Sequence, residues 1–263
     1  MTPPLRLAVN GASGRMGRAL LELLHADEDA ELVHAVVRPG SDDDGQLVPG
    51  AASGSLRYAH DWIHAPPIDV VVDFSGAAAL EQALDHCLAH GIALVSGTTG
   101  VDDGLAARLA DAAGKIAILR AANFSMGVAV LTRLLREAAA ALPAWDLEIV
   151  EAHHRHKRDA PSGTALALGH AAAAARQTTL DASAAFERSG ERVDGSIGFA
   201  VVRGGDVVGE HQALLIGTGE RLELVHRATD RSIFARGALR AAHWLAGKPA
   251  GEWHLDDVIG RLG

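Results

Sequence analysis

The sequence predicts an α/β protein that combines a parallel-sheet domain with an inserted α+β domain carrying a mixed sheet. Three observations predict this class. Short apolar runs alternate with helical patterns through the first half of the 263 residues, a glycine-rich turn follows the first run, and closely spaced strand patterns replace the alternation after Pro143.

The first half has the pattern of a parallel sheet. Strands are predicted at residues 5–10, 31–37, 68–75 and 91–99, with helices at about 14–26, around Cys87 and at about 102–113. Nearly continuous apolar strands separated by helices indicate a sheet covered on both faces. The stretch 38–55, rich in Gly, Ser, Pro and Asp, is expected to form a long surface loop.

The second half predicts a differently built domain. A helix near 127–141 precedes a strand that starts at Asp146, and an Ala-rich helix ends at about 176. Three further strand patterns, GSIGFAVVRGG, GEHQALLIG and ERLELVHRA, are separated by turn-forming Gly and Asp, which favours a mixed or antiparallel sheet. The helical pattern FARGALRAAHWLAG is expected to return to the first domain, so that the second domain is an insertion.

Composition narrows the possible functions. The formal net charge of −9 argues against nonspecific nucleic-acid binding, because such binding needs a basic face. No apolar run approaches the roughly 20 residues that span a bilayer, and the N-terminus lacks the apolar core of a signal peptide. We therefore expect a cytoplasmic protein with no nucleic-acid or membrane partner, in which the single Cys87 is buried and inert.

The stretch NGASGRMG places Gly11, Gly14 and Gly17 between the first strand and the first helix. Glycines at this place let the chain turn tightly and approach a pyrophosphate, whose charge the amides of the helix N-terminus stabilise. We interpret the stretch as a dinucleotide-binding turn of the Rossmann type. The alternative is a tight turn with close helix packing and no ligand.

Three more strand ends are candidates for nucleotide contacts. NAD-preferring folds usually carry an acid at the end of the second strand, whereas this chain has Val37 and Arg38 there. Valine cannot accept hydrogen bonds from a ribose and arginine can pair with a 2′-phosphate, so NADPH is expected to bind at least as well as NADH, unless Arg38 is only a solvated charge. Residues 97–99 and 73–75 end two other strands, either as ligand contacts or as plain turns.

Residues 151–164, EAHHRHKRDAPSGT, gather three histidines, two arginines and a lysine within six positions. A basic loop in an acidic protein, followed by a helix start with Ser162 or Thr164 near the cap, indicates a site for a small polyanion. Imidazoles exchange protons near neutral pH. We favour proton transfer with anion binding over a solvated basic loop and over a metal site, because the histidines lack zinc-helix spacing and no Cys or carboxylate cluster supplements them.

Together these motifs resemble the dihydrodipicolinate reductase family of bacterial lysine biosynthesis. The likeness runs, in the family's order, through NGASGRMG, VVDFS, SGTTG, AANFSMGV, EAHHRHKRDAPSGTA, GFAVVRGGDVVGEH and the C-terminal helix. It implies a Rossmann domain over 1–124, completed by 234–263, and a domain over 125–233 for substrate binding and homotetramer formation. It also implies that NADPH or NADH reduces a small dicarboxylate, 4-hydroxy-tetrahydrodipicolinate, to tetrahydrodipicolinate with loss of water.

The resemblance implies roles for individual residues. His153 would be a proton donor and acceptor and Lys157 a second proton donor, while His154, Gly163 and Thr164 would bind substrate and no metal would be held. The implied cofactor contacts, beside Arg38, are Gly11, Ala12, Ser13, Gly14, Arg15, Met16, Gly97, Thr98, Thr99, Ala121, Ala122, Asn123 and Phe124. Many members carry an acid before the arginine, and some a basic residue after the DF-[ST] stretch, so Val37 and Gly76 leave the nucleotide preference open.

Two other functions stay open at this stage. The same anion pocket would serve an NAD(P)-dependent reductase of another small dicarboxylate or imine. A non-enzymatic dinucleotide sensor would instead use the basic loop to contact a partner or DNA, and it would show no turnover.

Overall fold

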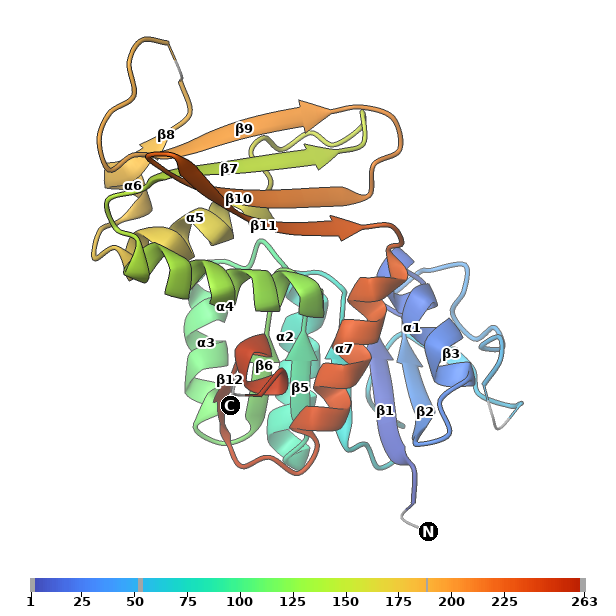
Figure 1. The fold of residues 1–263 in the computed structure, drawn as a ribbon. Coiled ribbons are helices and arrows are strands. Elements are labelled where there is room, and N and C mark those ends of the chain that lie inside the picture. Colours follow the sequence, from blue (N-terminus) through green and yellow to red (C-terminus); the bar gives the residue numbers. More distant parts are fainter. Residues whose placement is uncertain (1–2, 52–53, 188, 261–263) are drawn as a thin grey trace. The chain divides into compact units, whose positions relative to one another are not determined.

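A computed structural model describes residues 3–51, 54–187 and 189–260 (Figure 1). The chain divides into two compact units: unit 1 comprises Met1–Phe124 and Ser232–Gly263, and unit 2 comprises Ser125–Arg231. The chain thus leaves unit 1 for unit 2 and returns to unit 1 for its last segment. The assignment of nucleotide binding to the first unit and of substrate binding to the second stays a prediction.

Unit 1 is built on a seven-stranded parallel sheet in the order β12-β6-β5-β4-β1-β2-β3. Its strands are β1 (Leu5–Asn10), β2 (Ala30–Val36), β3 (Tyr58–Ala59), β4 (Val70–Asp73), β5 (Ala93–Ser96), β6 (Ala117–Arg120) and β12 (Gly251–Trp253). The chain winds outward in one direction from β1 and in the other from β4. The switch point of the sheet therefore lies between β1 and β4, which is where ligands bind in open parallel sheets.

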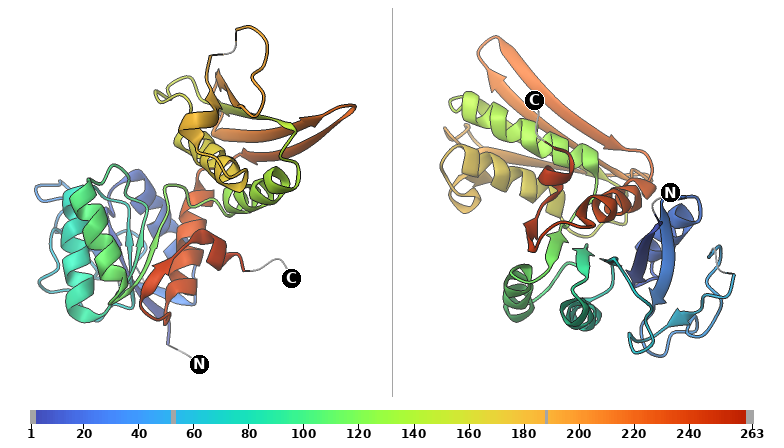
Figure 2. Two further views of the ribbon diagram at one scale, coloured as in Figure 1. Left: turned by 90° about the vertical axis from the view of Figure 1, so that its left-hand side faces the viewer. Right: turned by 90° about the horizontal axis from the view of Figure 1, so that it is seen from below.

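Helices cover both faces of this sheet. They are α1 (Arg15–His25), α2 (Ala77–His90), α3 (Asp103–Ala113), α7 (Ser232–Leu245) and the short α8 (Leu255–Val258). Helices α1 and α7 pack together on one face, and α2 and α3 pack together on the other (Figure 2). Cys87 lies on the buried face of α2, where burial raises the pKa of its thiol, so the buried cysteine predicted from the sequence is confirmed.

The predicted elements of the first half are present with shorter bounds. Strands β4 and β5 end earlier than expected, because the chain leaves the sheet after Asp73 and Ser96. Strands β3 and β12 were not predicted, since runs of two and three residues carry no readable periodicity. The expected loop over 38–55 holds no helix or strand among its described residues, while residues 52 and 53 lie outside them.

Unit 2 is a five-stranded sheet in the order β11-β10-β7-β9-β8, with helices packed on it (Figure 1). Its elements are α4 (Met126–Ala141), β7 (Asp146–His153), α5 (Gly163–Ala175), α6 (Leu180–Ser183), β8 (Ala184–Ala185), β9 (Ile197–Arg203), β10 (Gly209–Gly217) and β11 (Glu220–Ala228). Strand β7 pairs antiparallel with β10 and parallel with β9, so the predicted mixed sheet is confirmed. None of the helices within the described ranges has the length and apolar character needed to cross a membrane.

The buried face of β7 changes character along the strand. Leu147 and Ile149 lie in the apolar core of unit 2. Two and four residues beyond Ile149, the same face carries Glu151 and His153, which are also buried. Arg203 of β9 is the register partner of His153. We call this end of the face, formed by Glu151, His153, Arg203 and His211 of β10, the polar half.

Candidate active site

The glycine turn of unit 1 is shaped by close backbone contacts. Gly11 has a φ of +80°, a conformation that suits glycine, and a Cβ there would lie 2.5 Å from the carbonyl oxygen of Phe74. A Cβ on Gly17 would lie 2.3 Å from the carbonyl oxygen of Gly11. Gly14 is the N-cap of α1 and supplies no side-chain hydrogen bond. The first amides of α1 are therefore left to an external acceptor such as a phosphate.

A cavity of about 530 Å³ opens at this turn, within the size range of small-molecule sites. Its lining residues are Asn10, Gly11, Ser13, Gly14, Val37, Arg38, Ser41, Asp42, Asp43, Phe74, Ser75, Gly76 and Ala79. Four predicted cofactor residues, Gly11, Ser13, Gly14 and Arg38, are among them. Ala12 differs, since it is fully buried and its N–H donates to the carbonyl of Val36.

Carboxylates stand near Arg38 although Val37 offers none. Val37 is buried, and Asp42 and Asp43 from the following loop line the same cavity. Arg18 of α1 pairs with Asp43 at 3.4 Å. Both a cation for a 2′-phosphate and acceptors for a ribose hydroxyl are thus present in the cavity. The sequence reasoning missed these two acids because they lie in a stretch interpreted only as a surface loop.

Asp73 ties together the carboxyl ends of three strands rather than facing a ligand. Its buried carboxylate accepts hydrogen bonds from Asn10 Nδ2 at 2.8 Å, from Ser96 Oγ at 2.7 Å and from Thr98 Oγ1 at 2.7 Å. The Thr98 hydroxyl thus donates its hydrogen to Asp73, and the cofactor contact expected of Thr98 stays a prediction. Packing also requires a glycine at position 97, because a Cβ there would lie 2.2 Å from the ring of Phe74.

The remaining predicted cofactor residues of unit 1 lie at strand ends and at the start of α1. Arg15 and Met16 open α1. Ala121 follows β6 and its N–H donates to the carbonyl of Ser96 at 3.2 Å. Phe124 is buried and meets Phe74 edge-on, with ring centroids 5.4 Å apart. The segments Gly97–Thr99 and Ala121–Phe124 thus share the carboxyl edge of β5 and β6.

In unit 2, the predicted proton donor His153 is buried against Glu151. The two residues share one face of β7, and His153 Nδ1 lies 2.6 Å from a carboxylate oxygen of Glu151. The ring also meets His211 edge-on, at a centroid distance of 5.2 Å. Burial, followed by repulsion from His153, lowers the pKa of His211 to about 4, so His211 is neutral at physiological pH.

The start of α5 lies beside this cluster. Ser162 Oγ is 3.1 Å from His211 Nε2 and accepts the N–H of Ala165 at 3.2 Å, so the predicted cap is Ser162 rather than Thr164. Gly163 follows as the first residue of the helix, and a Cβ there would meet nothing within 4 Å. The predicted carboxylate site at Gly163 and Thr164 is thus on the first turn of a capped helix, with space at Gly163.

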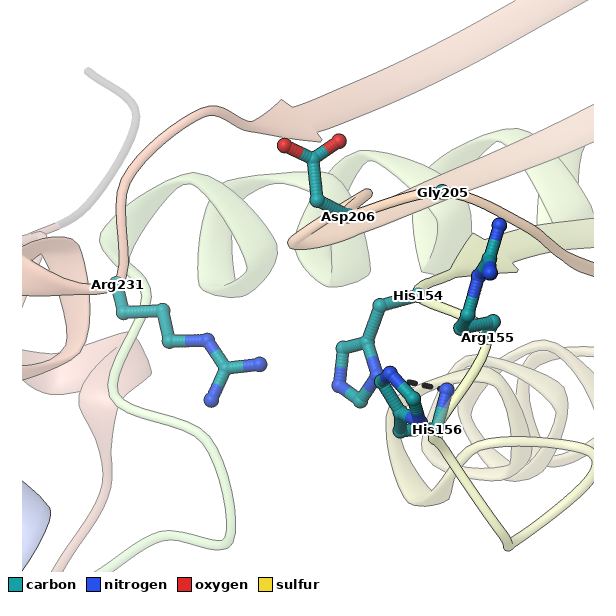
Figure 3. A pocket seen from close by; sticks show the side chains of 6 residues that line it. All are labelled: His154, Arg155, His156, Gly205, Asp206 and Arg231. Atoms are coloured by element: carbon teal, nitrogen blue, oxygen red, sulfur yellow. Dashed lines mark hydrogen bonds between the residues drawn. The ribbon is translucent and has the colours of Figure 1, made fainter.

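A second feature of unit 2 is a cationic cavity of about 620 Å³ (Figure 3). It is lined by His154, Arg155, His156, Gly205, Asp206 and Arg231. Figure 3 shows Arg231 extending toward the ring of His154, whose Nδ1 accepts the N–H of His156 at 3.2 Å. Partial burial, followed by repulsion from Arg231 and other cations, lowers the pKa of His154. With the guanidinium groups of Arg155 and Arg231 against the one carboxylate of Asp206, the lining carries a net positive charge, which favours an anionic ligand.

Lys157, the predicted second proton donor, is paired with a carboxylate. Its Nζ lies 2.8 Å from each oxygen of Asp159. The cationic stretch thus divides its residues: His154 faces the cavity with Arg231, His153 belongs to the polar half, and Lys157 is held at Asp159. Among residues 3–51, 54–187 and 189–260, no group of three or more His, Cys, Asp or Glu side chains is arranged to hold a metal ion.

Sequence reasoning missed most partners of the predicted donors. Glu151 could have been found, because it precedes His153 by two residues and so shares its strand face. Arg203 and His211 come from β9 and β10, and their proximity depends on strand pairing that a single sequence does not reveal. Arg231 stands just before α7 and gave no signal of its own.

Known proteins match the chain over nearly its whole length. The family model "Dihydrodipicolinate reductase, N-terminus" matches residues 5–124, and "Dihydrodipicolinate reductase, C-terminus" matches residues 127–259. The 4-hydroxy-tetrahydrodipicolinate reductase of Xanthomonas campestris pv. campestris (strain B100) is 47% identical over 258 residues, covering 98% of this chain and 99% of that protein. The enzyme of the same name from Thiobacillus denitrificans is 46% identical, covering 97% and 98%.

Solved structures agree with this relationship at the level of the fold. The dipicolinate-bound dihydrodipicolinate reductase from Paenisporosarcina sp. TG-14 superposes with a TM-score of 0.80 at 24% identity, covering 97% of this chain and 99% of that chain. GenD2 from gentamicin A biosynthesis, in complex with NAD, follows with a TM-score of 0.58 at 19% identity, covering 98% and 91%. On the two family models and the curated relatives, this chain belongs to the dihydrodipicolinate reductase family.

Proposed function

We propose that the chain is an NAD(P)H-dependent 4-hydroxy-tetrahydrodipicolinate reductase of the diaminopimelate and lysine pathway. The substrate loses water and gains a hydride and a proton, which yields tetrahydrodipicolinate. The observation that carries the proposal is the polar half of unit 2, where a proton-exchanging imidazole lies beside the capped start of α5, in a chain nearly half identical to curated reductases.

The cavity of unit 1 suits a nicotinamide dinucleotide. Such a nucleotide supplies a hydride when it is bound. The uncapped amides of α1 and the side-chain-free surfaces of Gly11 and Gly14 would receive its pyrophosphate. Arg38 would pair with a 2′-phosphate, whereas Asp42 and Asp43 would accept bonds from an unmodified ribose. We infer that both NADPH and NADH are used.

The cations and amides of unit 2 suit a small dicarboxylate, the class of ligand in the structurally similar dipicolinate complex. Amides of Gly163 and Thr164, at the positive end of α5, would bind one carboxylate. His154, beside Arg231 in the cationic cavity, would bind substrate as well. Opposite charge and directed N–H groups would favour a dicarboxylate over an uncharged cyclic imine.

Proton transfer would fall to His153 and Lys157. Hydride added to the conjugated C=C–C=N unit of the dehydrated substrate leaves an enamine, which needs a proton at carbon to become the imine of tetrahydrodipicolinate, and a positioned acid supplies it. His153 can deliver this proton from Nε2, since Nδ1 is engaged by Glu151. Lys157 would supply a second proton and positive charge once Asp159 releases its ammonium group.

The homotetramer and the cytoplasmic location implied by the resemblance stay predictions. Support for subunit association comes from the sheet of unit 2, which exposes Val202 to 53% and Val225 to 39%. Sedimentation of the purified chain tests the assembly, and a monomer at micromolar concentration would refute it.

The reaction is tested by following NADPH oxidation with freshly generated 4-hydroxy-tetrahydrodipicolinate and identifying the product by mass spectrometry. We expect substrate-dependent oxidation and tetrahydrodipicolinate as the product. Absence of turnover with a substrate that a curated relative consumes in the same assay would overturn the proposal. Turnover only with another dicarboxylate or imine would support the alternative reductase, and nucleotide binding without any turnover would support a sensor.

A further inference from the structure

Four hydrogen-bond donors converge on the carboxylate of Glu151, whose side chain is 0% exposed. His153 Nδ1 lies 2.6 Å and Arg203 Nη1 2.7 Å from Oε2. Arg203 Nη2 lies 2.7 Å and the backbone nitrogen of Ser162 2.9 Å from Oε1. Because a carboxylate has about four acceptor sites, the two oxygens are fully used.

The charge state of Glu151 fixes which nitrogen of His153 carries a proton. Burial alone raises the pKa of Glu151, but hydrogen bonds from Arg203, His153 and the Ser162 N–H outweigh burial and lower the pKa. An ionised carboxylate only accepts hydrogen bonds, so His153 Nδ1 must be the donor. His153 Nε2 is then the nitrogen that can exchange a proton with a substrate.

The space at Nε2 is preserved by a glycine. A Cβ on Gly209 of β10 would lie 3.1 Å from His153 Nε2, tighter than ordinary van der Waals contact. Any larger residue there would press on the edge of the ring that must meet a ligand. The structure thus constrains the ring on its Nδ1 side through Glu151 and leaves its Nε2 side uncrowded.

We propose that Glu151 is a positioning residue that holds His153 in its Nδ1-protonated form and fixes that ring relative to the first turn of α5. The second part follows from the bond between Glu151 Oε1 and the Ser162 N–H, because Ser162 caps the helix whose amides are proposed to bind a carboxylate. The inference rests on the proposed proton-transfer role of His153. Arg203 keeps the carboxylate ionised and oriented by a bidentate pair.

The same strand provides a matched control. Glu148 of β7 is also buried and also pairs with an arginine, Arg192. It points to the opposite face of the strand, away from His153. Glu148→Gln and Glu151→Gln each remove a buried charge of β7 that pairs with an arginine from another segment. Only Glu151→Gln changes the polar half.

Glu151→Gln replaces two acceptor oxygens by one oxygen and one NH₂ group. The NH₂ group of the new amide would then lie against two hydrogen-bond donors, so the cluster must rearrange. An NH₂ group next to His153 Nδ1 also favours the form of the ring in which Nδ1 has lost its proton and can accept a hydrogen bond. Misplacing the proton of a catalytic histidine costs up to about 10⁴-fold in kcat in the serine-protease triad. We expect kcat to fall at least roughly tenfold below that of Glu148→Gln, with NADPH affinity unchanged.

The direct readout is the ¹⁵N spectrum of the His153 ring, assigned by comparison with His153→Gln. The wild type and Glu148→Gln are expected to show the Nδ1-protonated tautomer of the neutral ring, and Glu151→Gln to lose it. A merely structural glutamate would move stability but not the tautomer. Retention of the Nδ1-protonated tautomer in Glu151→Gln, or a kcat equal to that of Glu148→Gln, would overturn the proposal.

Two further variants keep the result interpretable. Glu151→Asp keeps a negative charge for Arg203, but its shorter side chain moves the carboxylate away from His153 by one methylene. This variant is therefore expected to fold and to lower kcat. A wild-type kcat in Glu151→Asp would overturn the proposal even if Glu151→Gln did not fold. Wild-type kcat in His153→Gln would instead refute the proton-transfer role in the proposed function. The tautomer measurement distinguishes these two failures, because it does not depend on activity.

Discussion

The two candidate anion sites of this chain differ in the groups that form them, which are mainly backbone groups in unit 1 and side chains in unit 2. In unit 1 the glycine turn presents backbone groups to a ligand, because Gly14 leaves the first amides of α1 without a side-chain cap. Gly11 and Gly17 let chain segments approach within distances that a Cβ would not allow. In unit 2 the helix start is capped by Ser162, and ionisable side chains such as His153 are proposed to supply the chemistry. The first site would bind through backbone groups, whereas the second would act through side chains in a defined protonation state.

The contrast predicts opposite responses to mutation. Adding atoms to the turn of unit 1 should disturb folding and nucleotide binding together, because the backbone itself is the site. Removing a proton-carrying group from unit 2 should lower turnover while nucleotide binding persists. The following variants test this difference, and the first three have a control at a similar residue elsewhere in the chain.

The largest of these effects is expected for Lys157→Met. The change removes a proton donor and a charge while keeping an unbranched side chain, and loss of an acid group typically costs about 10²- to 10⁴-fold in rate. Steady-state kinetics should show a lower kcat with an unchanged KM for NADPH. Lys115→Met, at an exposed lysine of unit 1, is the control. Equal effects of the two variants would remove Lys157 from the reaction.

The next effect concerns His211 and the stability of unit 2 in acid. Burial lowers the pKa of His211 to about 4 in the folded protein, against about 6.5 in an unfolded chain. As the pH falls below the unfolded value, the unfolded chain takes up a proton that the folded chain refuses. This histidine therefore lowers the free energy of unfolding by up to about 3 kcal/mol between its two pKa values.

Urea unfolding at a series of pH values checks this expectation. His211→Gln, which has no titrating ring, should lose less stability than the wild type as the pH falls from neutrality to about 4. His170→Gln changes an exposed histidine of α5 and serves as control. Parallel stability curves for the wild type and His211→Gln would contradict the assigned burial effect.

Gly17→Ala tests the expectation that added atoms disturb folding and nucleotide binding together in unit 1. The added methyl would lie 2.3 Å from the carbonyl oxygen of Gly11, and overpacking of this kind costs about 1–3 kcal/mol. Thermal unfolding should show the loss, and calorimetry should show weaker NADPH binding. Gly104→Ala in the first turn of α3 has room for its methyl, with the closest atom at 3.4 Å. We expect it to be neutral or stabilising by up to about 1 kcal/mol.

The smallest effect is expected at the nucleotide-selecting end of the cavity. Arg38→Ala should raise the KM for NADPH by about tenfold, the size of one lost charge-assisted hydrogen bond, and change that for NADH little. Val37→Glu should shift the preference toward NADH by restoring an acceptor for the ribose. If both variants keep the wild-type ratio of the two KM values, Arg38 is a solvated charge and the preference lies elsewhere.

The same contrast explains what could be predicted from the sequence. The parallel sheet, the mixed sheet and the Ser162 cap follow from local patterns, because apolar periodicity and capping act within a few residues. A glycine turn is equally local. The polar half is not: Arg203 reaches Glu151 only because β9 pairs with β7, which joins residues separated by 52 positions.

Local patterns left two tertiary contacts unseen for a related reason. The sequence predicts that Thr98 lies at a strand end, but it does not show that the Thr98 hydroxyl donates to Asp73 of the neighbouring strand. Asp42 and Asp43 lie in a stretch whose pattern indicates only a polar loop, yet both line the cavity of unit 1 that is proposed to bind the nucleotide. A sequence shows which groups can form hydrogen bonds, whereas strand pairing and loop placement decide which partners they meet.

The central claim is that His153 transfers a proton in an NAD(P)H-dependent reduction. The most direct measurement is kcat for 4-hydroxy-tetrahydrodipicolinate in the wild type and in His153→Gln, with NADPH affinity measured by calorimetry on the same samples. The account predicts a fall in kcat of about 10²- to 10⁴-fold at unchanged NADPH affinity. A kcat equal to that of the wild type, or a parallel loss of NADPH binding, would contradict it.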